Sequence, residues 1–372
     1  MVMSLAMAAL PRATWRVLNG VVVCALLCST AFVPQIAHGL GTDVNAATGA
    51  PPNAIFVFGD SYLDTGNHNK SAVFNRPWLA PYGVTYPGTP AGRFSDGRVF
   101  ADVFANALQM MSPIAYELRF SDPNAPKHGM NFAVGGSGVF NPYGMLNLGG
   151  QIDQLESLID IVYPKAFLQY SVVLVGIHGN DYGAYLAKGN PVSGIPVFQR
   201  LVVGEMVYQL ERLNKLGFKT FYINNIQPIG CLPSSTRPEF NECSEDTDAI
   251  MSVGHNDLLV AAVAKLTQRL PEATFRILDL YSAFTAVLRD PAKYGISTEP
   301  LMPCCLGAGN ATRSCGEFGR HGKPMFTVCK NPAKSFFWDT NHPSQAGWIA
   351  VTKVLFPDAD LEPLSSTQHR QG

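Results

Sequence analysis

Short apolar runs alternate with helical patterns along most of this chain, and this alternation restricts its fold more than any other feature. Five runs predict buried strands that begin near Ala54, Asn131, Ser171, Thr220 and Thr274. Between them, apolar residues recur at the spacing of amphipathic helices. Strands and helices that alternate in this way form right-handed βαβ crossovers, which build a parallel sheet with helices on both faces. We therefore predict an α/β protein with three layers, α/β/α, around a five-stranded parallel sheet.

The first predicted strand leads into a turn that presents a serine. The five apolar residues Ala54–Phe58 suit a buried parallel strand, and Gly59 permits the sharp turn that follows. Asp60 and Ser61 are small polar residues that suit such a turn. Ser61 is thus expected at the carboxyl end of a strand, where open α/β sheets bind ligands. Gly-Asp-Ser also occurs in ordinary turns, so this segment alone leaves a purely structural role open.

An aspartate and a histidine stand close together near the end of the chain. Asp339 and His342 follow a short aromatic run, and a closing helix is predicted over residues 344–355. A carboxylate in such a loop can hold an imidazole three positions later, which leaves the second ring nitrogen free as a base. The alternative is that Asp339 caps a turn and His342 is a surface residue.

Two further strand ends carry groups that could serve a reaction. Gly135 and Gly136 follow the second predicted strand, where backbone N–H groups can approach another group closely. Asn180 follows the third predicted strand. The carboxyl ends of parallel strands share one edge of a sheet. We therefore expect Ser61, the glycine pair and Asn180 to meet at that edge.

These four segments resemble, in the same order, the four sequence blocks of the GDSL family of the SGNH hydrolases, most closely its secreted plant esterase/lipase branch. GDSYLDTGN is similar to the first block, NFAVGGSG to the second, GNDY to the third and DTNHP to the last. The resemblance covers nearly all of the chain after residue 39 and implies a flavodoxin-like SGNH hydrolase fold. One departure stands in the third block, which usually reads Gly-x-Asn-Asp. Here the order is His178-Gly179-Asn180-Asp181, so His178 is expected to change the local pocket.

The resemblance implies a role for each candidate residue. Ser61 would be the nucleophile, His342 the base that takes its proton, and Asp339 the residue that orients His342. The oxyanion hole would consist of the backbone N–H groups of Ser61 and Gly136 and the side-chain amide of Asn180. Gly135 is the alternative donor in this block, and the register after Asn131 favours Gly136. We expect the neighbouring carboxylates, Asp60 and Asp64, to brace the turn rather than react.

Three functions remain open at this stage. The first is a serine esterase or lipase that cleaves acyl or acetyl esters of a small molecule or lipid through an acyl-enzyme on Ser61. The second is an acyltransferase that passes the same acyl group from a lipid ester to an alcohol. The third is a secreted binding protein whose hydrolase fold is catalytically dead. The four intact sequence blocks speak against the third.

Other chemistries lack their motifs in this sequence. There is no Gly-x-Ser-x-Gly nucleophile elbow, no phosphate-binding loop and no dinucleotide fingerprint, so we predict no cofactor. The formal net charge is −1, from 27 basic and 28 acidic residues, which gives no electrostatic case for a nucleic-acid partner. We expect a monomer.

The first 39 residues are predicted to be a secretory signal peptide. Arg12 and Arg16 precede an apolar stretch over Val17–Val33, and small residues near Ala37 and Gly39 suit a cleavage site. An uncleaved membrane anchor is the alternative, although polar residues interrupt the run. After it, we predict one domain over residues 40–372, no transmembrane anchor, and secretion to the extracellular space, with another secretory compartment left open.

Six cysteines remain after residue 39 and are expected to form up to three disulfides, since the secretory route is oxidising. Cys231 with Cys243 is the favoured local pair. The other four share a long loop over residues 299–330 in a connectivity that stays open: Cys304, Cys305, Cys315 and Cys329. A zinc site is the competing interpretation, but neither Cys-x-x-Cys nor His-Glu-x-x-His occurs, and we predict no metal. Asn69 and Asn310 each begin a glycosylation sequon.

Overall fold

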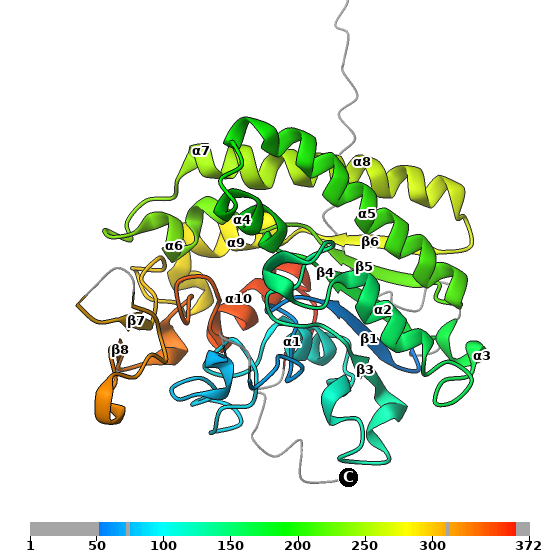
Figure 1. Ribbon diagram of the computed structural model, residues 1–372, viewed down its shortest axis with the longest axis horizontal. Helices are drawn as coiled ribbons and strands as arrows, with labels where there is room; N and C mark the ends of the chain where they lie inside the picture. The colour runs from blue at the N-terminus through cyan, green and yellow to red at the C-terminus, as the bar shows by residue number, and fades with distance from the viewer. Residues whose placement is uncertain (1–51, 72–74, 310–312, 362–372) are drawn as a thin grey trace, which may run out of the picture. The chain divides into compact units, whose positions relative to one another are not determined.

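The computed structural model describes residues 52–71, 75–309 and 313–361. Six parallel strands form one sheet in the order β2-β3-β1-β4-β5-β6 (Figure 1). The strands are β1 (Ile55–Gly59), β2 (Ile114–Ala115), β3 (Gly129–Asn131), β4 (Val172–Gly176), β5 (Thr220–Asn224) and β6 (Thr274–Leu278). Because β1 lies between β3 and β4, its carboxyl end opens near the middle of the sheet edge. The α/β class with a parallel sheet is confirmed.

The sheet has one strand more than the five that the sequence predicted. The additional strand, β2, is two residues long and pairs with β3 at the edge. A strand of two residues is too short to leave a periodic pattern in the sequence. The strand expected to start near Asn131 is β3, which begins two residues earlier and ends at Asn131. The amides of Phe132 and Val134 still donate to the carbonyls of Val57 and Gly59 on β1, at 2.7 and 3.0 Å.

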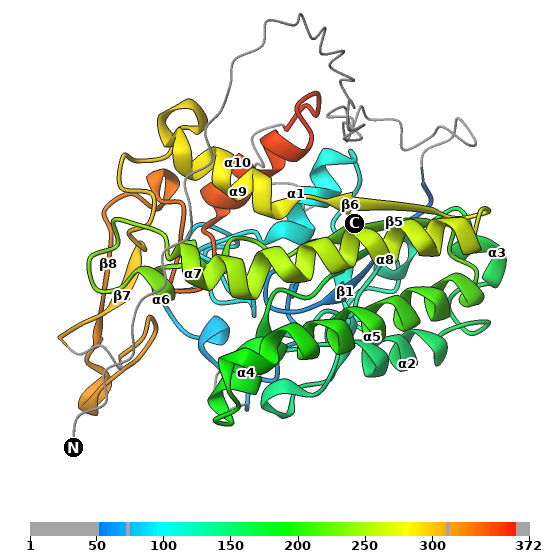
Figure 2. The same cartoon turned by 90° about the horizontal axis from the view of Figure 1, so that it is seen from above.

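The two faces of the sheet follow from the alternation of side chains along each strand. On β1, Ile55 and Val57 point into one core cluster, and Phe56 and Phe58 into the other. The first cluster includes residues of α1 (Phe100–Ala107), α9 (Leu280–Arg289) and α10 (Gln345–Leu355). The second includes residues of α2 (Leu148–Glu156), α5 (Ile195–Leu216) and α8 (Gly254–Arg269). Figure 2 shows α1, α9 and α10 on one side of the strands and α2 and α5 on the other. The protein therefore has the predicted three layers.

The helices lie between the strands and after the last strand of the described chain. They are α1 (Phe100–Ala107), α2 (Leu148–Glu156), α3 (Lys165–Leu168), α4 (Asn180–Ala187), α5 (Ile195–Leu216), α6 (Pro233–Thr236), α7 (Glu245–Asp248), α8 (Gly254–Arg269), α9 (Leu280–Arg289) and α10 (Gln345–Leu355). A π-helical turn joins α7 to α8. The resulting stretch, Glu245–Arg269, is the one described helix that is long and apolar enough to cross a membrane. This is weak evidence for a membrane span, because core helices of soluble proteins have the same length and composition.

Three disulfides are present in the described part of the chain. Cys231 pairs with Cys243, as predicted. The connectivity that the sequence left open is Cys304–Cys329 and Cys305–Cys315. These two bridges hold a small antiparallel hairpin inside the long loop, formed by β7 (Cys305–Gly307) and β8 (Phe326–Val328).

The hairpin packs against the segment that carries the candidate aspartate. The amides of Cys304 and Cys305 donate to the carbonyls of Phe337 and Trp338 at 3.0 and 2.7 Å. The buried side chain of Trp338 shares one apolar cluster with Tyr82 and the hairpin cysteines. The disulfide-rich loop therefore supports the segment that leads into Asp339.

Some of the sequence predictions concern residues outside the described ranges. These are the signal peptide over residues 1–39 and the sequon at Asn310. The other sequon residue, Asn69, is described and exposed.

Candidate active site

Ser61 lies in the turn that follows β1, at the carboxyl edge of the sheet. The amides of Leu63 and Asp64 both donate to the carbonyl of Asp60 at 3.0 Å, which closes the turn. Gly59 enters the turn with a φ of +153°, and a Cβ at this position would collide with a carbonyl oxygen of the neighbouring strand β4. The approach to the serine therefore requires glycine.

Ser61, His342 and Asp339 form one continuous series of hydrogen bonds. Nε2 of His342 lies 2.9 Å from Oγ of Ser61, although 281 positions separate the two residues. Nδ1 of the same ring lies 2.8 Å from Oδ1 and 2.9 Å from Oδ2 of Asp339. A carboxylate only accepts hydrogen bonds, so Nδ1 carries a proton, and Nε2 accepts from the serine hydroxyl whenever it carries none. Such a ring can remove the proton from Oγ.

Asp339 accepts hydrogen bonds from several directions besides His342. The backbone amides of Asn341 and His342 donate to Oδ1 at 2.8 and 2.9 Å, and the hydroxyl of Tyr82 donates to Oδ2 at 2.7 Å. Burial opposes ionisation of this carboxyl, but the neighbouring His342 and these donors outweigh it, so the pKa of Asp339 lies below its usual value. Sequence reasoning missed Tyr82, because nothing in its loop relates it to a carboxylate 257 positions later.

The glycine pair after β3 approaches the serine turn from one side. The amide of Gly135 donates to Oδ2 of Asp64 at 2.8 Å, so it is occupied. Gly136 has a φ of +81°. In the part of the chain that the structure describes, the amides of Ser61 and Gly136 donate to no protein group. Two backbone donors at this edge are thus available to a ligand.

Asn180 approaches from the other side, as the first residue of α4 after β4. Its Nδ2 donates to the carbonyl of Ser137 at 2.9 Å and lies 3.3 Å from Oδ2 of Asp60. Since these two acceptors are the neighbours of Gly136 and Ser61 in sequence, the structure brings all five predicted site residues to one edge of the sheet.

Asp60 and Asp64 brace the serine turn through buried hydrogen bonds. Oδ1 of Asp60 accepts from the amide of Tyr62 at 3.1 Å and from Nδ1 of His178 at 2.8 Å, and its Oδ2 accepts from the amide of His178 at 2.6 Å. Oδ1 of Asp64 accepts from the amides of Gly66 and Asn67 at 2.8 and 2.7 Å. His178 therefore does not line an open pocket but lies buried behind the turn.

Gln151 is a second residue that sequence reasoning missed. It is fully buried on α2, where its Oε1 accepts from the amide of Gly59 and its Nε2 donates to the carbonyl of the same glycine, both at 2.8 Å. Nε2 also donates to Oγ of Ser137 at 2.9 Å. A signal was present, because Gln151 is a polar residue on the apolar stripe of Leu148 and Leu155.

The loop after the glycine pair is fixed by Asp181 and carries exposed apolar side chains. The carboxylate of Asp181 accepts from the amides of Val139 and Phe140 at 2.9 and 3.1 Å. Burial raises the pKa of Asp181 to about 6, which the two amides only partly oppose. Phe140, Tyr143 and Leu146 are 37%, 49% and 37% exposed. The loop after Gly136 therefore carries three partly exposed, largely apolar side chains.

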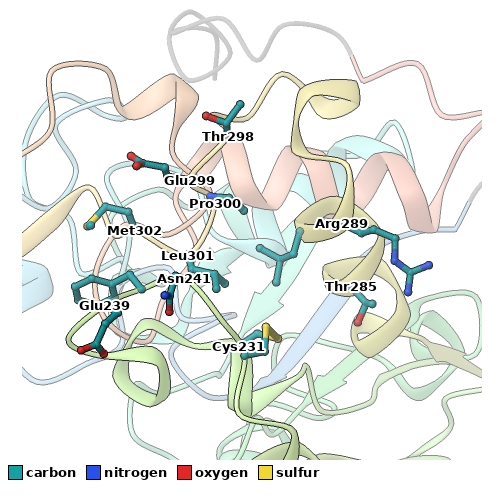
Figure 3. A pocket seen from close by; sticks show the side chains of 13 residues that line it. Cys231, Glu239, Asn241, Thr285, Arg289, Thr298, Glu299, Pro300, Leu301 and Met302 are labelled. Carbon is teal, nitrogen blue, oxygen red and sulfur yellow. A yellow bond between two sulfur atoms is a disulfide. The ribbon is translucent and has the colours of Figure 1, made fainter.

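A separate cavity of 550 Å³ lies between α9 and the loop after residue 296, beside the Cys231–Cys243 bridge (Figure 3). Its walls do not include Ser61, Asp339 or His342, so it is not the candidate active site. Within residues 52–71, 75–309 and 313–361, no cluster of three or more His, Cys, Asp or Glu side chains could hold a metal ion.

Comparison with known proteins identifies the family of this chain. The family model described as GDSL-like Lipase/Acylhydrolase matches residues 55–355. A GDSL esterase/lipase of Arabidopsis thaliana is 42% identical over 313 residues, which are 82% of this chain and 86% of the relative. A second one is 39% identical over 315 residues, 82% and 87% of the two chains. A third is 37% identical over 323 residues, 84% and 88% of the two chains.

The matched region begins in β1, just before Ser61, and ends at the last residue of α10, so it contains every segment of the site described above. The resemblance drawn from the four sequence blocks is confirmed. This chain belongs to the GDSL-like lipase/acylhydrolase family and is a hydrolase of the esterase and lipase class.

Proposed function

We propose that this hydrolase cleaves carboxylic esters through an acyl-enzyme on Ser61. The observation that supports the proposal most directly is the unbroken series Asp339, His342 and Ser61, with 2.8 Å and 2.9 Å between successive polar atoms. Oγ of Ser61 attacks the ester carbonyl as Nε2 of His342 takes its proton. The tetrahedral intermediate then expels the alcohol, which leaves with that proton. Water attacks the acyl-serine in the same way, and the acid is released.

Three donors stabilise the oxyanion in this proposal. They are the free amides of Ser61 and Gly136 and the side-chain amide of Asn180. Loss of one such donor typically lowers turnover by about 10²- to 10³-fold. Asp339 fixes the tautomer of His342 and stabilises the imidazolium, and its lowered pKa keeps it charged for this purpose.

We propose an ester with an apolar acyl chain as the substrate. The support is the apolar surface of Phe140, Tyr143 and Leu146, three partly exposed side chains in the loop after Gly136. An acyl group attached to Ser61 can lie on this surface. A lipid ester or a small ester with a medium acyl chain has that chemistry.

The test is a series of p-nitrophenyl esters of rising chain length, with Ser61→Ala as the matched variant. We expect hydrolysis by the parent protein that rises beyond the acetyl ester, a serine-reactive phosphonate bound at Ser61, and loss of both in Ser61→Ala. Activity that survives in Ser61→Ala refutes the acyl-enzyme. Failure of the phosphonate to label folded protein favours a binding protein instead.

A second arm of the same assay addresses acyl transfer. A lipophilic alcohol is added to the reaction, and the products are separated into free acid and new ester. Free acid as the main product supports hydrolysis. New ester as the main product means that the alcohol, rather than water, reaches the acyl-serine, and the protein is then an acyltransferase.

We also propose that the protein is a secreted, glycosylated monomer. In this proposal residues 1–39 are a cleaved signal peptide, residues 40–372 are a single domain, and Asn69 and Asn310 carry glycans. Three disulfides and the exposure of Asn69 support an oxidising secretory route. Sequencing the N-terminus of protein recovered from the medium of expressing cells tests the cleavage of the signal peptide. The change in mass on removal of N-glycans tests the two glycosylation sites. Recovery of an intact N-terminus in the cell fraction contradicts them.

A further inference from the structure

His178 stands behind the proposed oxyanion hole, at the position where the third sequence block departs from its usual form. Its side chain is 2% exposed, and its Nδ1 lies 2.8 Å from Oδ1 of Asp60. Its backbone amide donates to Oδ2 of the same carboxylate at 2.6 Å. His178 thus supplies two of the four hydrogen bonds that Asp60 accepts from described residues; the amide of Tyr62 and the side chain of Asn180 supply the others.

The imidazole of His178 is fixed on both of its edges. Because Asp60 only accepts, Nδ1 carries the proton, and Nε2 can then accept from Nδ2 of Asn224 on β5, which lies 3.2 Å away. The ring also stacks on Tyr62, with centroids 4.6 Å apart and an angle of 29° between the planes. The N–H group that faces Asp60 is therefore held in place.

The side-chain amide of Asn180 already has two acceptors within the protein, unlike the other two proposed oxyanion donors. Its Nδ2 carries two protons, and in the described structure one is directed to the carbonyl of Ser137 at 2.9 Å and the other to Asp60 at 3.3 Å. An oxyanion on the substrate needs one of them. The contact with Asp60 is the longer, and Asp60 retains three other donors when Asn180 leaves it.

We propose that His178 is a positioning residue for the oxyanion hole: its imidazole N–H satisfies Asp60 and so leaves the side-chain amide of Asn180 available to the substrate oxyanion. This inference rests on the proposed function of Ser61. Without the imidazole N–H, Asp60 would draw the amide of Asn180 toward itself. Asn180 would then contribute less in the transition state, while binding of the substrate would be unchanged.

The experiment compares three substitutions at His178 in ester hydrolysis. His178→Leu removes the N–H, and we expect kcat to fall about tenfold or more while KM changes by less than about twofold. His178→Asn can donate from the position of Nδ1, and we expect it to restore most of kcat. If His178→Leu does not fold, His178→Phe serves in its place, because it keeps an aromatic ring on Tyr62 without a donor. A folded His178→Asn variant that loses as much kcat as the variant without a donor overturns the proposal.

A double-mutant cycle with Asn180→Ala separates positioning from a general structural effect. If His178 acts through Asn180, the leucine substitution lowers kcat by less than about twofold in the Asn180→Ala background. Two independent effects would multiply instead, which would refute the proposal. His255→Asn is the matched control, because His255 is also fully buried and hydrogen-bonded, through Nδ1 to the hydroxyl of Tyr182 at 2.6 Å, without contact with Asp60. We expect its kcat to be that of the parent protein.

Different results would refute the acyl-enzyme on Ser61 and the role of His178. If Ser61→Ala retains activity, the proposed acyl-enzyme is wrong and the role of His178 falls with it. If Ser61→Ala is inactive but His178→Leu has the kcat of the parent protein, only the role of His178 is wrong. Phosphonate labelling of Ser61 in each His178 variant verifies that the nucleophile is intact.

Discussion

Removal of the Tyr82 hydroxyl is the most informative single change in the neighbourhood of Asp339. The hydroxyl donates to Oδ2 at 2.7 Å in a buried setting, and Tyr82→Phe deletes it with no other loss of atoms. A hydrogen bond to a charged group contributes about 1.5–3 kcal/mol. We expect Tyr82→Phe to lower the free energy of unfolding at pH 7 by an amount in that range. If the same loss reaches the transition state, kcat falls about tenfold to hundredfold.

Tyr82→Phe should also change how the stability and activity of the protein depend on pH. The folded-state pKa of Asp339 is depressed, so its contribution to stability is present above the unfolded pKa and is lost as the pH falls through the folded pKa. Tyr82→Phe removes one of the donors that lower this pKa. The variant should therefore lose stability and activity at a higher pH than the parent protein does. Urea unfolding and kcat/KM, each measured from neutral to acidic pH, test this expectation.

Tyr163→Phe is the matched control. Tyr163 is also buried, but its hydroxyl has no hydrogen-bond partner among the described residues, so its removal should cost no stability. The reasoning about Asp339 is refuted if Tyr82→Phe and Tyr163→Phe have the same free energy of unfolding and the same pH profile of activity.

Two further predictions concern the buried polar groups around the site. Gln151→Leu leaves the amide of Gly59 without its partner, so we expect the free energy of unfolding in urea to fall by about 1–3 kcal/mol. Gln154→Leu, at a partly exposed position on the same helix, should change it little, and equal stabilities of the two variants would contradict the role of Gln151. Burial raises the folded-state pKa of Asp181 to about 6, so its contribution to stability is present below its unfolded pKa and is lost as the pH rises through 6. The whole loss is at most about 3 kcal/mol. In Asp181→Asn this part of the pH dependence between pH 4 and 7 should vanish from the unfolding free energy, and an unchanged slope would show that Asp181 does not titrate there.

The sequence predicted the layers because its two central strands, β1 and β4, are buried on both faces. Ala54–Phe58 and the run before His178 have no polar interruption, and this pattern is typical of central strands in a parallel sheet. The edge strand β2 was not predictable, since its two residues derive their extended form from pairing with β3 rather than from their own pattern.

The sequence also identified residues that the structure places at one edge of the sheet, because they stand in short blocks with recognisable spacing. It did not identify the residues that hold them. Tyr82 and Asn224 each make one of these contacts, to Asp339 and His178, and no local pattern encodes such a contact. Gln151 makes two hydrogen bonds to Gly59, 92 positions away, and only its place on an apolar helix face marks it in the sequence. His178 was noticed only as a departure, and its burial behind Asp60 depends on how β1 and β4 are paired.

The buried polar contacts also explain how a loop residue can be held to a fixed geometry. The turn at Ser61 is connected to the segment after β4 through Asp60, to the segment after β3 through Asp64, and to α2 through the backbone of Gly59. A shift of any of these elements by one residue would leave a buried donor or acceptor unpaired, at about 1–3 kcal/mol for each group. These contacts therefore help to hold the turn that places Oγ of Ser61 at 2.9 Å from Nε2 of His342. Loss of the carboxylate of Asp60 or Asp64 would therefore release the turn from one of these neighbouring segments.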